Sequence, residues 1–592
     1  MTAVPTSPPR PLSAPAAARL RASLDRLYPQ PEAARTYERL AALLTEHLAE
    51  YPPSADAPKL FDETDVVLIT YGDQVTEPGH APLATLADFL DTHVAGTITG
   101  VHVLPFYPST SDDGFAVVDY DAVDPALGGW DDIERLGKRF RLMVDAVFNH
   151  VSASSRWFRA WREGDPRYAG FFPVVGGEVD LSGVIRPRTS PLLTAVRTPE
   201  GPRRVWTTFS PDQVDLDYRN PEVLLAVTRS LLGYLAHGAG IVRLDAIAFL
   251  WKTIGTSCVH LGQTHETIRL WRTIVDLVAP TTLLITETNV PHAENVSYFG
   301  DGTDEAHLVY QFPLAPLVLS TFHLADSETL REWAASLSTP SPKTTFLNFL
   351  SSHDGIGLRP AEGLLTRSEI NQLADLSRAH GGGVSFRAEA DGRLSPYELN
   401  TAYFDALTPV DSTEPLTTQV DRFLSAQSIL LALQGVPAIY VESLLGSGNW
   451  IEGVKQTGRL RTINREKFDR RALERGLADV SSRRHQVFNR LLRRIATRTS
   501  QPAFHPNAAQ RVLDTAPSLF ALERTAVDGS SRLVCVHSVS GRSQRYRSTD
   551  LRVAGELTDT ETRERYAPDA DGQVDVDLAP YGVRWLREEL GG

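Results

Sequence analysis

Four segments of the chain end an apolar run with side chains that can carry chemistry. They are DAVFNH at 145–150, RLD at 243–245, Glu287, and the His-Asp pair at 353–354. A single Asp or His at a strand end often caps the next helix. Four such ends in one series are better explained by a shared catalytic site, because the carboxyl ends of barrel strands meet at one face. Carboxyl, imidazole and guanidinium groups gathered there would bind substrate and exchange protons.

The apolar runs alternate with helix-like stretches. Seven runs are typical of buried β-strands, and they lie at 66–71, 100–106, 142–148, 240–247, 283–288, 346–354 and 435–441. Strands that alternate with helices indicate parallel βαβ units, and seven or eight such units predict a closed (β/α)8 barrel. The predicted fold class is therefore α/β.

Other intervals interrupt or extend this barrel. Residues 151–220 are rich in Gly, Pro, Arg and Trp, 358–410 contains AHGGG, and the chain after about residue 500 has short alternating strands, which indicate an antiparallel sheet. We expect an N-terminal tail and helical extension at 1–60, barrel segments at 61–150, 221–357 and 411–500, an inserted subdomain B at 151–220, a second loop-rich insertion at 358–410 and a C-terminal antiparallel β-domain at 501–592.

Composition argues against several classes of protein. The chain of 592 residues has 59 Lys and Arg against 73 Asp and Glu, a net charge of −14 that disfavours nucleic acid and anionic membranes as partners. Two cysteines, Cys258 and Cys535, exclude a disulfide framework and a Cys-based zinc site. No apolar run reaches the roughly 20 residues of a membrane span, and the N-terminal region lacks the apolar segment of a secretory signal. We expect a cytoplasmic protein whose oligomeric state, with a homodimer among the options, stays open.

The four segments, in this order and spacing, resemble the hallmark regions of the α-amylase family of glycoside hydrolases and transglycosylases. Other segments are similar to its sucrose-phosphorylase branch, namely ITYGD at 69–73, LPFYPSTSDDGF at 104–115, LDAIAFLWKTIGTSCVH at 244–260 and HDGIGL at 353–358. A finer similarity, to glucosylglycerate phosphorylases, rests on ETNVPH at 287–292, DEAHLVYQF at 304–312, RPRTSPLLT at 186–194 and SPYELN at 395–400. The resemblance covers residues 64–470 and implies a retaining glycoside phosphorylase.

Retaining cleavage of an α-glucosidic bond needs a nucleophilic carboxylate and an acid/base carboxyl about 5–5.5 Å apart. The resemblance implies that Asp245 is the nucleophile, that Glu287 is the acid/base, and that Asp354 stabilises the transition state. It also implies that Arg243 keeps Asp245 ionised. Side chains two apart on a strand point to the same side, so Arg243 and Asp245 should meet.

The resemblance implies further contacts with glucose. His150 and His353 would donate hydrogen bonds near the ring, and Phe115 would either offer its ring face to the sugar or belong to the core. Asp73 and Arg465 would form an ion pair that closes the pocket beyond one glucose unit, which argues against digestion of starch. The alternative for this pair is an ordinary surface salt bridge.

The phosphate and acceptor contacts implied by the resemblance lie in the two insertions and after Glu287. Arg186 and Arg188 are the phosphate candidates, since guanidinium groups suit phosphate and carboxylate alike. Arg188 matches the phosphate-contacting arginine of sucrose phosphorylases, and Tyr397 matches a tyrosine there. Asn289 and Glu398 stand where sucrose phosphorylases carry a histidine and a glutamine. Both changes put sucrose in doubt as the substrate.

We therefore predict that an α-glucoside and phosphate are converted, by double displacement, into α-glucose 1-phosphate and a small polar acceptor. Glucosylglycerate is the first choice of substrate, followed by glucosylglycerol, sucrose 6′-phosphate and sucrose. An exo-acting α-glucosidase or transglucosidase would use the same carboxylates without a phosphate site. A transporter subunit with an amylase-like domain would lack these carboxylates. Asn149 sits where some amylases bind calcium, but we recognise no other ligands and expect neither a metal nor a cofactor.

Overall fold

The computed structural model describes residues 12–53, 59–188, 190–388, 393–551, 553 and 555–588. Eight parallel strands close a barrel in the order β1-β16-β12-β11-β10-β9-β4-β3, so the predicted barrel is confirmed. The strands are β1 Val67–Thr70, β3 Gly100–Val103, β4 Arg141–Ala146, β9 Ala239–Leu244, β10 Leu283–Thr286, β11 Leu308–Tyr310, β12 Thr345–Asn348 and β16 Val436–Tyr440. Seven of them overlap the predicted runs, whereas β11 has three residues and is too short to stand out by its pattern.

Helices follow most barrel strands and cover their outer face, while the strands' own side chains fill the barrel interior. The strands are therefore buried on both faces. The longer ones are α3 Pro82–His93, α4 Trp130–Arg139, α6 Pro221–Ala236, α7 Gly262–Val278, α9 Leu314–Leu324, α13 Leu416–Ala432 and α17 Arg483–Thr499. Shorter ones are α8 His292–Val296, α10 Glu328–Ala335, α14 Val441–Leu444, α15 Ile451–Thr457 and α16 Arg470–Ala478. Local sequence explains where α6 begins, because the Asn220 side chain accepts a hydrogen bond from the backbone N–H of Glu222 and Pro221 fixes the first turn.

Contacts divide the chain into two compact units. The first unit comprises residues 1–60, 103–288 and 296–309, and the second comprises 61–102, 289–295 and 310–592. Within the first unit, β9 lies between β4 and β10, and its Arg243 is aligned with Asp145 on one side and Ile285 on the other. Within the second unit, β16 lies between β12 and β1.

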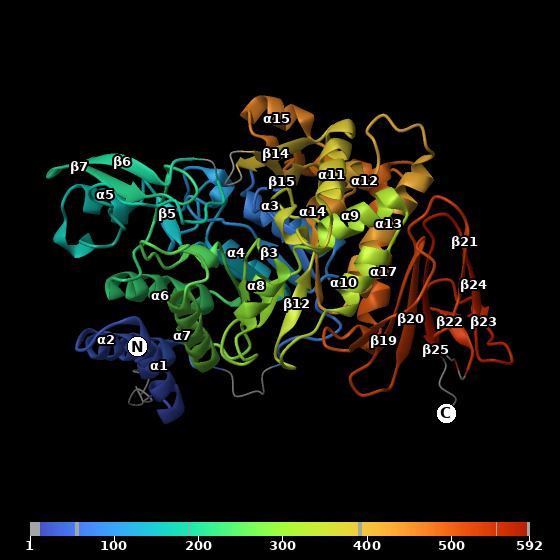
Figure 1. The fold of residues 1–592 in the computed structure, drawn as a ribbon, viewed down its shortest axis with the longest axis horizontal. Coiled ribbons are helices and arrows are strands. Elements are labelled where there is room, and N and C mark those ends of the chain that lie inside the picture. Colours follow the sequence, from blue (N-terminus) through green and yellow to red (C-terminus); the bar gives the residue numbers. More distant parts are fainter. Residues whose placement is uncertain are drawn as a thin grey trace. The chain divides into compact units, whose positions relative to one another are not determined.

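The first unit also contains an N-terminal helical pair and the first insertion. Helices α1 Ala14–Leu27 and α2 Glu32–Glu50 pack on α6 and α7, and the Tyr28 hydroxyl donates to the Tyr218 carbonyl at 2.9 Å. The insertion holds α5 Arg156–Arg162, the pair of β5 His150–Ser152 with β8 Gln213–Asp215, and the hairpin of β6 Leu193–Thr198 and β7 Gly201–Trp206. The hairpin is labelled in Figure 1.

The second insertion, in the second unit, differs from the loop-rich segment that we predict. It contains helix α11 Arg367–Ala379, the hairpin of β14 Gly383–Ala388 and β15 Leu394–Asn400, and the short helix α12 Tyr403–Leu407. A capping box begins α11, because the Glu369 carboxylate accepts from the Thr366 backbone N–H at 2.7 Å while the Thr366 hydroxyl accepts from the Glu369 N–H at 3.3 Å. The Thr-x-x-Glu spacing was the available signal for this helix, and the glycines that suggested a loop follow its end.

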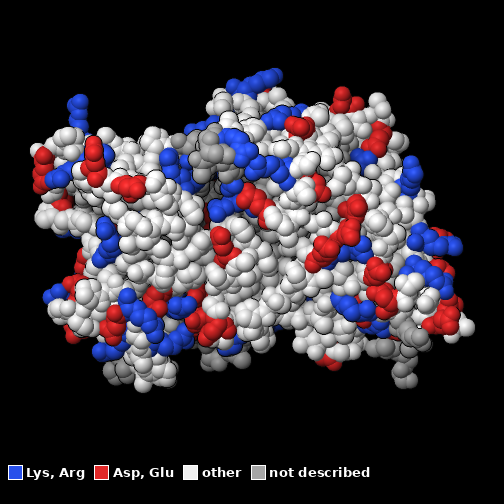
Figure 2. Space-filling view, viewed as in Figure 1, with Lys and Arg blue, Asp and Glu red and all other residues white. Residues whose placement is uncertain are grey.

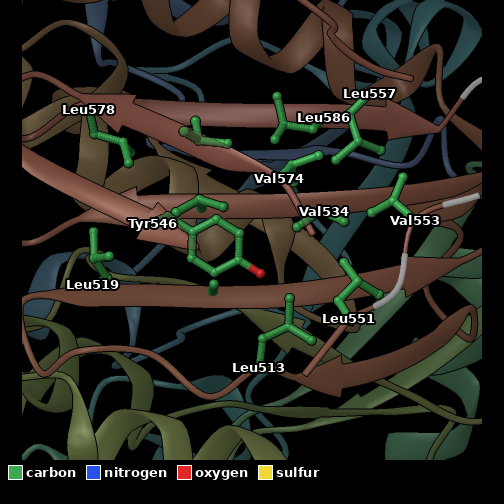
Figure 3. Packing of buried hydrophobic residues seen from close by; sticks show 13 residues of the cluster. Leu513, Leu519, Val534, Tyr546, Leu551, Val553, Leu557, Val574, Leu578 and Leu586 are labelled. Atoms are coloured by element: carbon green, nitrogen blue, oxygen red, sulfur yellow. The ribbon is translucent and has the colours of Figure 1, made fainter. Parts of the chain in front are cut away.

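The C-terminal part of the second unit is antiparallel, as predicted. A six-stranded sheet has the order β18-β19-β20-β25-β22-β23, and β21 pairs with β24. The bounds are β18 Ala509–Val512, β19 Leu519–Thr525, β20 Arg532–Ser538, β21 Gln544–Arg547, β22 Leu557–Asp559, β23 Arg565–Tyr566, β24 Asp575–Leu578 and β25 Val583–Glu588. Figure 3 shows how apolar side chains such as Leu519, Val534, Tyr546 and Leu586 gather into one buried core. Strand β24 alternates exposed and buried residues, which explains its DVDL sequence.

Charged side chains of both signs are mixed over the face drawn in Figure 2. Within the described ranges, no helix has both the length and the apolar character needed to cross a membrane.

Candidate active site

Three carboxyl groups surround one guanidinium at the ends of β4, β9 and β10 in the first unit. Arg243 donates from Nη1 to Asp145 and to Asp245 Oδ1, the latter at 2.7 Å, and its Nη2 lies 3.8 Å from Glu287 Oε2. Asp145 is wholly buried, Arg243 and Asp245 are nearly so, and the Glu287 side chain is 16% exposed. The expected meeting of Arg243 and Asp245 is confirmed.

Backbone hydrogen bonds fix the two predicted catalytic carboxyls just past their strands. The Asp245 N–H donates to the Ala146 carbonyl and the Glu287 N–H to the Leu244 carbonyl, each at 3.1 Å, so the ladder continues one residue beyond β9 and β10. Ala246 then adopts a left-handed conformation with φ of 49°, and its N–H donates to Glu287 Oε2 at 3.0 Å. The turn after Asp245 therefore orients the carboxyl of Glu287.

The electrostatics of this cluster act in opposite directions on the pKa of Asp245. Burial raises the pKa of Asp245, the Arg243 guanidinium opposes this shift, and the nearby Glu287 and Asp145 carboxylates add to it. One guanidinium cannot neutralise three carboxylates, so the cluster holds a proton more strongly than isolated carboxyl groups would. Retaining glycoside cleavage needs an ionised nucleophile, so the effect of Arg243, which lowers the pKa of Asp245, is the one that the nucleophile requires.

Two predicted glucose contacts lie in the same unit. The Phe115 ring faces Arg243, whose Cζ is 5.6 Å from the ring centroid, and Phe115 is 7% exposed. His150 Nε2 lies 2.9 Å from the Phe115 carbonyl and 3.2 Å from Gln213 Nε2. Burial lowers the pKa of His150, which favours the neutral ring, and the contact of Nε2 ties the ring to the loop of Phe115.

The position of Asn149 can be compared with the calcium site of some amylases. Lys252 Nζ donates to Asn149 Oδ1 at 2.9 Å and lies 2.7 Å from Asp215 Oδ2, and all three side chains are buried. An ammonium group therefore supplies the positive charge at this point. In the described part of the chain, no group of three or more His, Cys, Asp and Glu side chains could hold a metal ion.

The predicted phosphate ligands Arg186 and Arg188 lie in the first insertion, also in the first unit. The adjoining Ile185 N–H donates to the Ser257 carbonyl at 3.0 Å, which anchors the loop. Arg186 is exposed and Arg188 is half-buried. Neither guanidinium forms an ion pair or hydrogen bond with a residue that the structure describes, so both are available to an anion.

In the second unit, Asp354 and His353 lie on a loop rather than directly at a strand end, because β12 ends at Asn348. Asp354 Oδ1 is 2.6 Å from Arg461 Nη1 and 3.8 Å from Arg465 Nη2. Its Oδ2 is 3.6 Å from His353 Nε2, and the Asp354 side chain is 29% exposed. Three cationic or hydrogen-bonding groups thus face this carboxylate.

The predicted ion pair of Asp73 with Arg465 is wrong as a description of the structure. Asp73 Oδ1 lies 2.5 Å from Lys467 Nζ instead. The Arg465 Nε donates to the His353 carbonyl at 2.7 Å, which directs that guanidinium elsewhere. Lys467 comes two residues after Arg465 and also lies 3.9 Å from the Tyr71 ring centroid, so the nearer cation takes the carboxylate.

The carboxylate of Glu398, on β15, is held by other protein groups. Its Oε1 accepts from Arg461 Nη2 at 2.7 Å and from the Gly355 N–H at 3.1 Å, and its Oε2 accepts from Arg461 Nε at 3.2 Å. Glu398 is 3% exposed. These contacts differ from the direct acceptor contact that the resemblance implies.

The other two predicted acceptor residues lie beside β13 Ile356–Gly357 in the second unit. The Asn289 amide packs against Gly357, where an added Cβ would lie 2.9 Å from its Nδ2 and Oδ1. The Asn289 Oδ1 is buried and lacks a hydrogen-bond partner among the described residues. The Tyr397 carbonyl accepts from the Leu358 N–H at 3.0 Å, which pairs the hairpin with this segment.

Known proteins resemble this chain in sequence over most of its length. Residues 93–356 match the α-amylase catalytic domain. The chain is 51% identical over 484 residues to the glucosylglycerate phosphorylase of Allomeiothermus silvanus, in an alignment that covers 82% of this chain and 86% of that one. It is 46% identical over 581 residues to the glucosylglycerate phosphorylase of Spirochaeta thermophila, with 96% and 98% covered. The chain belongs to the glycoside phosphorylases of the α-amylase family.

A solved structure extends this relationship to the fold of the enzyme. The crystal structure of sucrose 6F-phosphate phosphorylase from Thermoanaerobacter thermosaccharolyticum is similar with a TM-score of 0.69 and 25% sequence identity, covering 87% of this chain and 98% of that one. The predicted family, its sucrose-phosphorylase branch and the glycoside phosphorylase class are therefore confirmed.

Three cations that pair with carboxylates in the two units were missed from the sequence. Arg461 pairs with Asp354, Lys467 with Asp73, and Lys252 is buried against Asp215. The segment RTINREK at 461–467 shows that cations cluster around Arg465. Nothing in the local sequence says which carboxylate each cation meets, since the partners are far away along the chain.

Proposed function

We propose that the enzyme is a glucosylglycerate phosphorylase that converts glucosylglycerate and phosphate into α-glucose 1-phosphate and glycerate with retention. The names of the relatives support the substrate. The chemistry rests on one observation, the Arg243 guanidinium shared by Asp145, Asp245 and Glu287. This cluster can supply both a nucleophilic carboxylate and a proton.

In the first step, a carboxylate oxygen of Asp245 attacks the anomeric carbon of glucose. The bond between that carbon and the glycerate oxygen breaks, and Glu287 gives its proton to the departing oxygen. The Ala246 N–H holds the Glu287 carboxyl at 3.0 Å, which supports this orientation. Asp354 would stabilise the positive charge that develops on the sugar ring.

In the second step, a phosphate oxygen attacks the anomeric carbon from the side that glycerate has left. The ester bond to Asp245 breaks and Glu287 takes the proton from the attacking phosphate. Two inversions restore the α configuration, and the enzyme returns to its starting protonation state.

We assign phosphate binding to Arg188, with Arg186 as the second candidate. Their lack of ion pairs within the described residues supports this assignment, because an anion would meet guanidinium groups that no carboxylate neutralises. Asn289 and Tyr397 are proposed acceptor contacts. The buried Oδ1 of Asn289, which has no partner among the described residues, would accept a hydrogen bond from a hydroxyl group of glycerate.

For the glucose side we propose Asp73, Phe115, His150, His353 and Arg465. The contact between Phe115 and Arg243, and the two cationic neighbours of Asp354, support these assignments. Asp73 forms an ion pair with Lys467. We propose that both side chains of this ion pair line the far end of the glucose.

The test is a phosphorolysis screen over glucosylglycerate, glucosylglycerol, sucrose 6′-phosphate and sucrose. We expect α-glucose 1-phosphate from all substrates that react and the highest kcat/KM with glucosylglycerate. A matched reaction without phosphate measures hydrolysis. Free glucose as the main product in the presence of phosphate would favour an exo-acting α-glucosidase instead. A higher kcat/KM with another of these glucosides would identify that glucoside, rather than glucosylglycerate, as the substrate.

We also propose that the enzyme works in the cytoplasm. Cys258 and Cys535 are both free thiols and both buried, which suits a reducing compartment. Cell fractionation with an antibody against the protein tests this, and recovery in the periplasmic or secreted fraction would contradict it.

A further inference from the structure

Glu398 joins three segments of the second unit. It lies on β15 of the second insertion, it is buried, and its two carboxylate oxygens bind the side chain of Arg461 and the backbone of Gly355. Arg461 belongs to the 3-10 helix at Leu460–Asn464, and Gly355 directly follows Asp354. The insertion is therefore tied to the loop of the proposed transition-state stabiliser.

Arg461 connects Glu398 to the carboxylate of Asp354. Its Nη1 lies 2.6 Å from Asp354 Oδ1, while its Nε and Nη2 bind both oxygens of Glu398. One planar guanidinium thus links two carboxylates, and its forked geometry fixes the direction from which each one is approached. Movement of Glu398 would shift the guanidinium and, with it, Asp354.

We propose that Glu398 is a positioning residue for Asp354, acting through Arg461 and the Gly355 backbone. Glu398 therefore acts in the glucosyl-donor half of the reaction, in which the glucosyl-enzyme forms, and does not contact the acceptor. This inference rests on the role of Asp354 in the proposed function. It differs from the acceptor contact that the resemblance to sucrose phosphorylases implies for this position.

Three observations favour positioning over acceptor binding. Both oxygens of Glu398 are bound by protein donors, and the residue is 3% exposed. A carboxylate would also repel phosphate and glycerate, which are both anions. The backbone is fitted closely around Glu398, because a Cβ on Gly355 would lie 2.5 Å from its Cγ and 2.6 Å from the Leu399 carbonyl oxygen.

The negative charge of Glu398 is central to this arrangement. With Glu398 ionised, Arg461 divides its attraction between two carboxylates. Glutamine has nearly the same size but no charge, so the guanidinium would pair more strongly with Asp354 and compete with the sugar hydroxyls for it. We therefore expect Glu398→Gln to impair the formation of the glucosyl-enzyme.

The experiment measures Glu398→Gln with two donors. α-Glucosyl fluoride reports formation of the glucosyl-enzyme without glycerate or phosphate, and glucosylglycerate with phosphate reports the whole reaction. Loss of one hydrogen bond to a charged group corresponds to roughly a ten- to hundredfold change in rate. We expect kcat/KM to fall by this factor, and by the same amount for both donors. The KM for phosphate should stay unchanged, and so should the KM for glycerate in the reverse reaction. Unchanged turnover of the fluoride, or a loss confined to the KM of phosphate or glycerate, would overturn the proposal.

A matched control and a second variant separate positioning from general damage. Glu362 pairs with Arg387 at 2.7 Å in the same insertion, and Glu362→Gln should leave both reactions unchanged. Arg461→Gln breaks the same link, so the double variant with Glu398→Gln should lose no more than Arg461→Gln alone. Losses that multiply in the double variant would show independent roles and contradict the proposal. If Glu398→Gln does not fold, Arg461→Lys, which keeps the charge but not the fork, must show the equal loss on both donors.

Failure of this inference can be told apart from failure of the proposed function. The fluoride assay involves neither glycerate nor phosphate. An equal loss on the fluoride and on whichever glucoside reacts would support Glu398 as a positioning residue even if glucosylglycerate proved not to be the substrate. Phosphorolysis of glucosylglycerate by the wild type, with no effect of Glu398→Gln on the fluoride, would leave the function standing and reject the inference.

Discussion

Replacement of Arg243 by Met removes the charge at the centre of the carboxyl cluster while keeping a long, flexible side chain. Arg243 has Asp145 and Asp245 within hydrogen-bond distance and Glu287 at 3.8 Å, and its side chain is 4% exposed. Breaking a buried ion pair from one side destabilises a protein by about 3–5 kcal/mol. We expect the free energy of unfolding of Arg243→Met to fall by about that amount at neutral to mildly alkaline pH.

The loss should depend on pH, and its sign follows from the pKa shift. Burial raises the pKa of Asp245 even with Arg243 present, and removing the cation raises it further. A carboxyl group whose pKa is higher in the folded protein than in the unfolded chain lowers the free energy of unfolding at pH values above its unfolded pKa of about 4. This loss of stability becomes smaller as the pH falls and the group is protonated. Arg243→Met should therefore be least stable, relative to the wild type, at the alkaline end and regain stability in mild acid.

The assay is urea unfolding, followed by circular dichroism, of wild type and variant across this pH range. Arg35→Met is the matched control, since it breaks an exposed pair with Glu32 at 2.6 Å and surface pairs are worth about 0–1 kcal/mol. The same urea midpoint for Arg243→Met and wild type at alkaline pH, or a loss that does not change with pH, would refute the reasoning.

Three further variants test the catalytic assignments. Asp245→Asn should lose essentially all turnover. Its free energy of unfolding at alkaline pH should nevertheless rise by about 0.5–2 kcal/mol, because the substitution removes one of three crowded carboxylates. Residual turnover above a few per cent, or a lower free energy of unfolding, would count against this. Glu287→Gln should slow phosphorolysis by about 10²–10⁴ and α-glucosyl fluoride far less, since fluoride needs little protonation; equal losses would remove Glu287 from the acid role. Arg188→Ala should raise the KM for phosphate by roughly ten- to a hundredfold and increase the ratio of glucose to glucose 1-phosphate, with Arg186→Ala measured beside it. An unchanged ratio in Arg188→Ala would place the phosphate site elsewhere.

Much of the fold and the centre of the site could be predicted from the sequence, because both depend on local patterns. Buried parallel strands are apolar along their length, so polar residues such as Asp245 and Glu287 stand out where strands end. The spacing of Arg243 and Asp245 fixes a shared side of the strand, and the structure has them in contact. Strand β11 escaped notice because three residues carry too little pattern.

Contacts between distant segments could not be predicted in the same way. Asp73 meets Lys467 rather than Arg465, and Glu398 meets Arg461, across hundreds or tens of residues of chain. A carboxylate attracts any nearby cation, so the choice depends on how the backbone brings segments together. The resemblance implied an acceptor contact for Glu398, whereas its partners Arg461 and Gly355 became visible only in the folded chain.

The central claim, that Asp245 carries the glucosyl group between two partners, can be tested by trapping the ester. Glu287→Gln would be mixed with α-glucosyl fluoride, quenched in acid, digested and examined by mass spectrometry. We predict one peptide, containing Asp245, that gains the mass of one anhydroglucose unit and loses it when phosphate is added before the quench, with α-glucose 1-phosphate as the product. A label on another carboxyl group, or no labelled peptide while the fluoride is still consumed, would contradict the account.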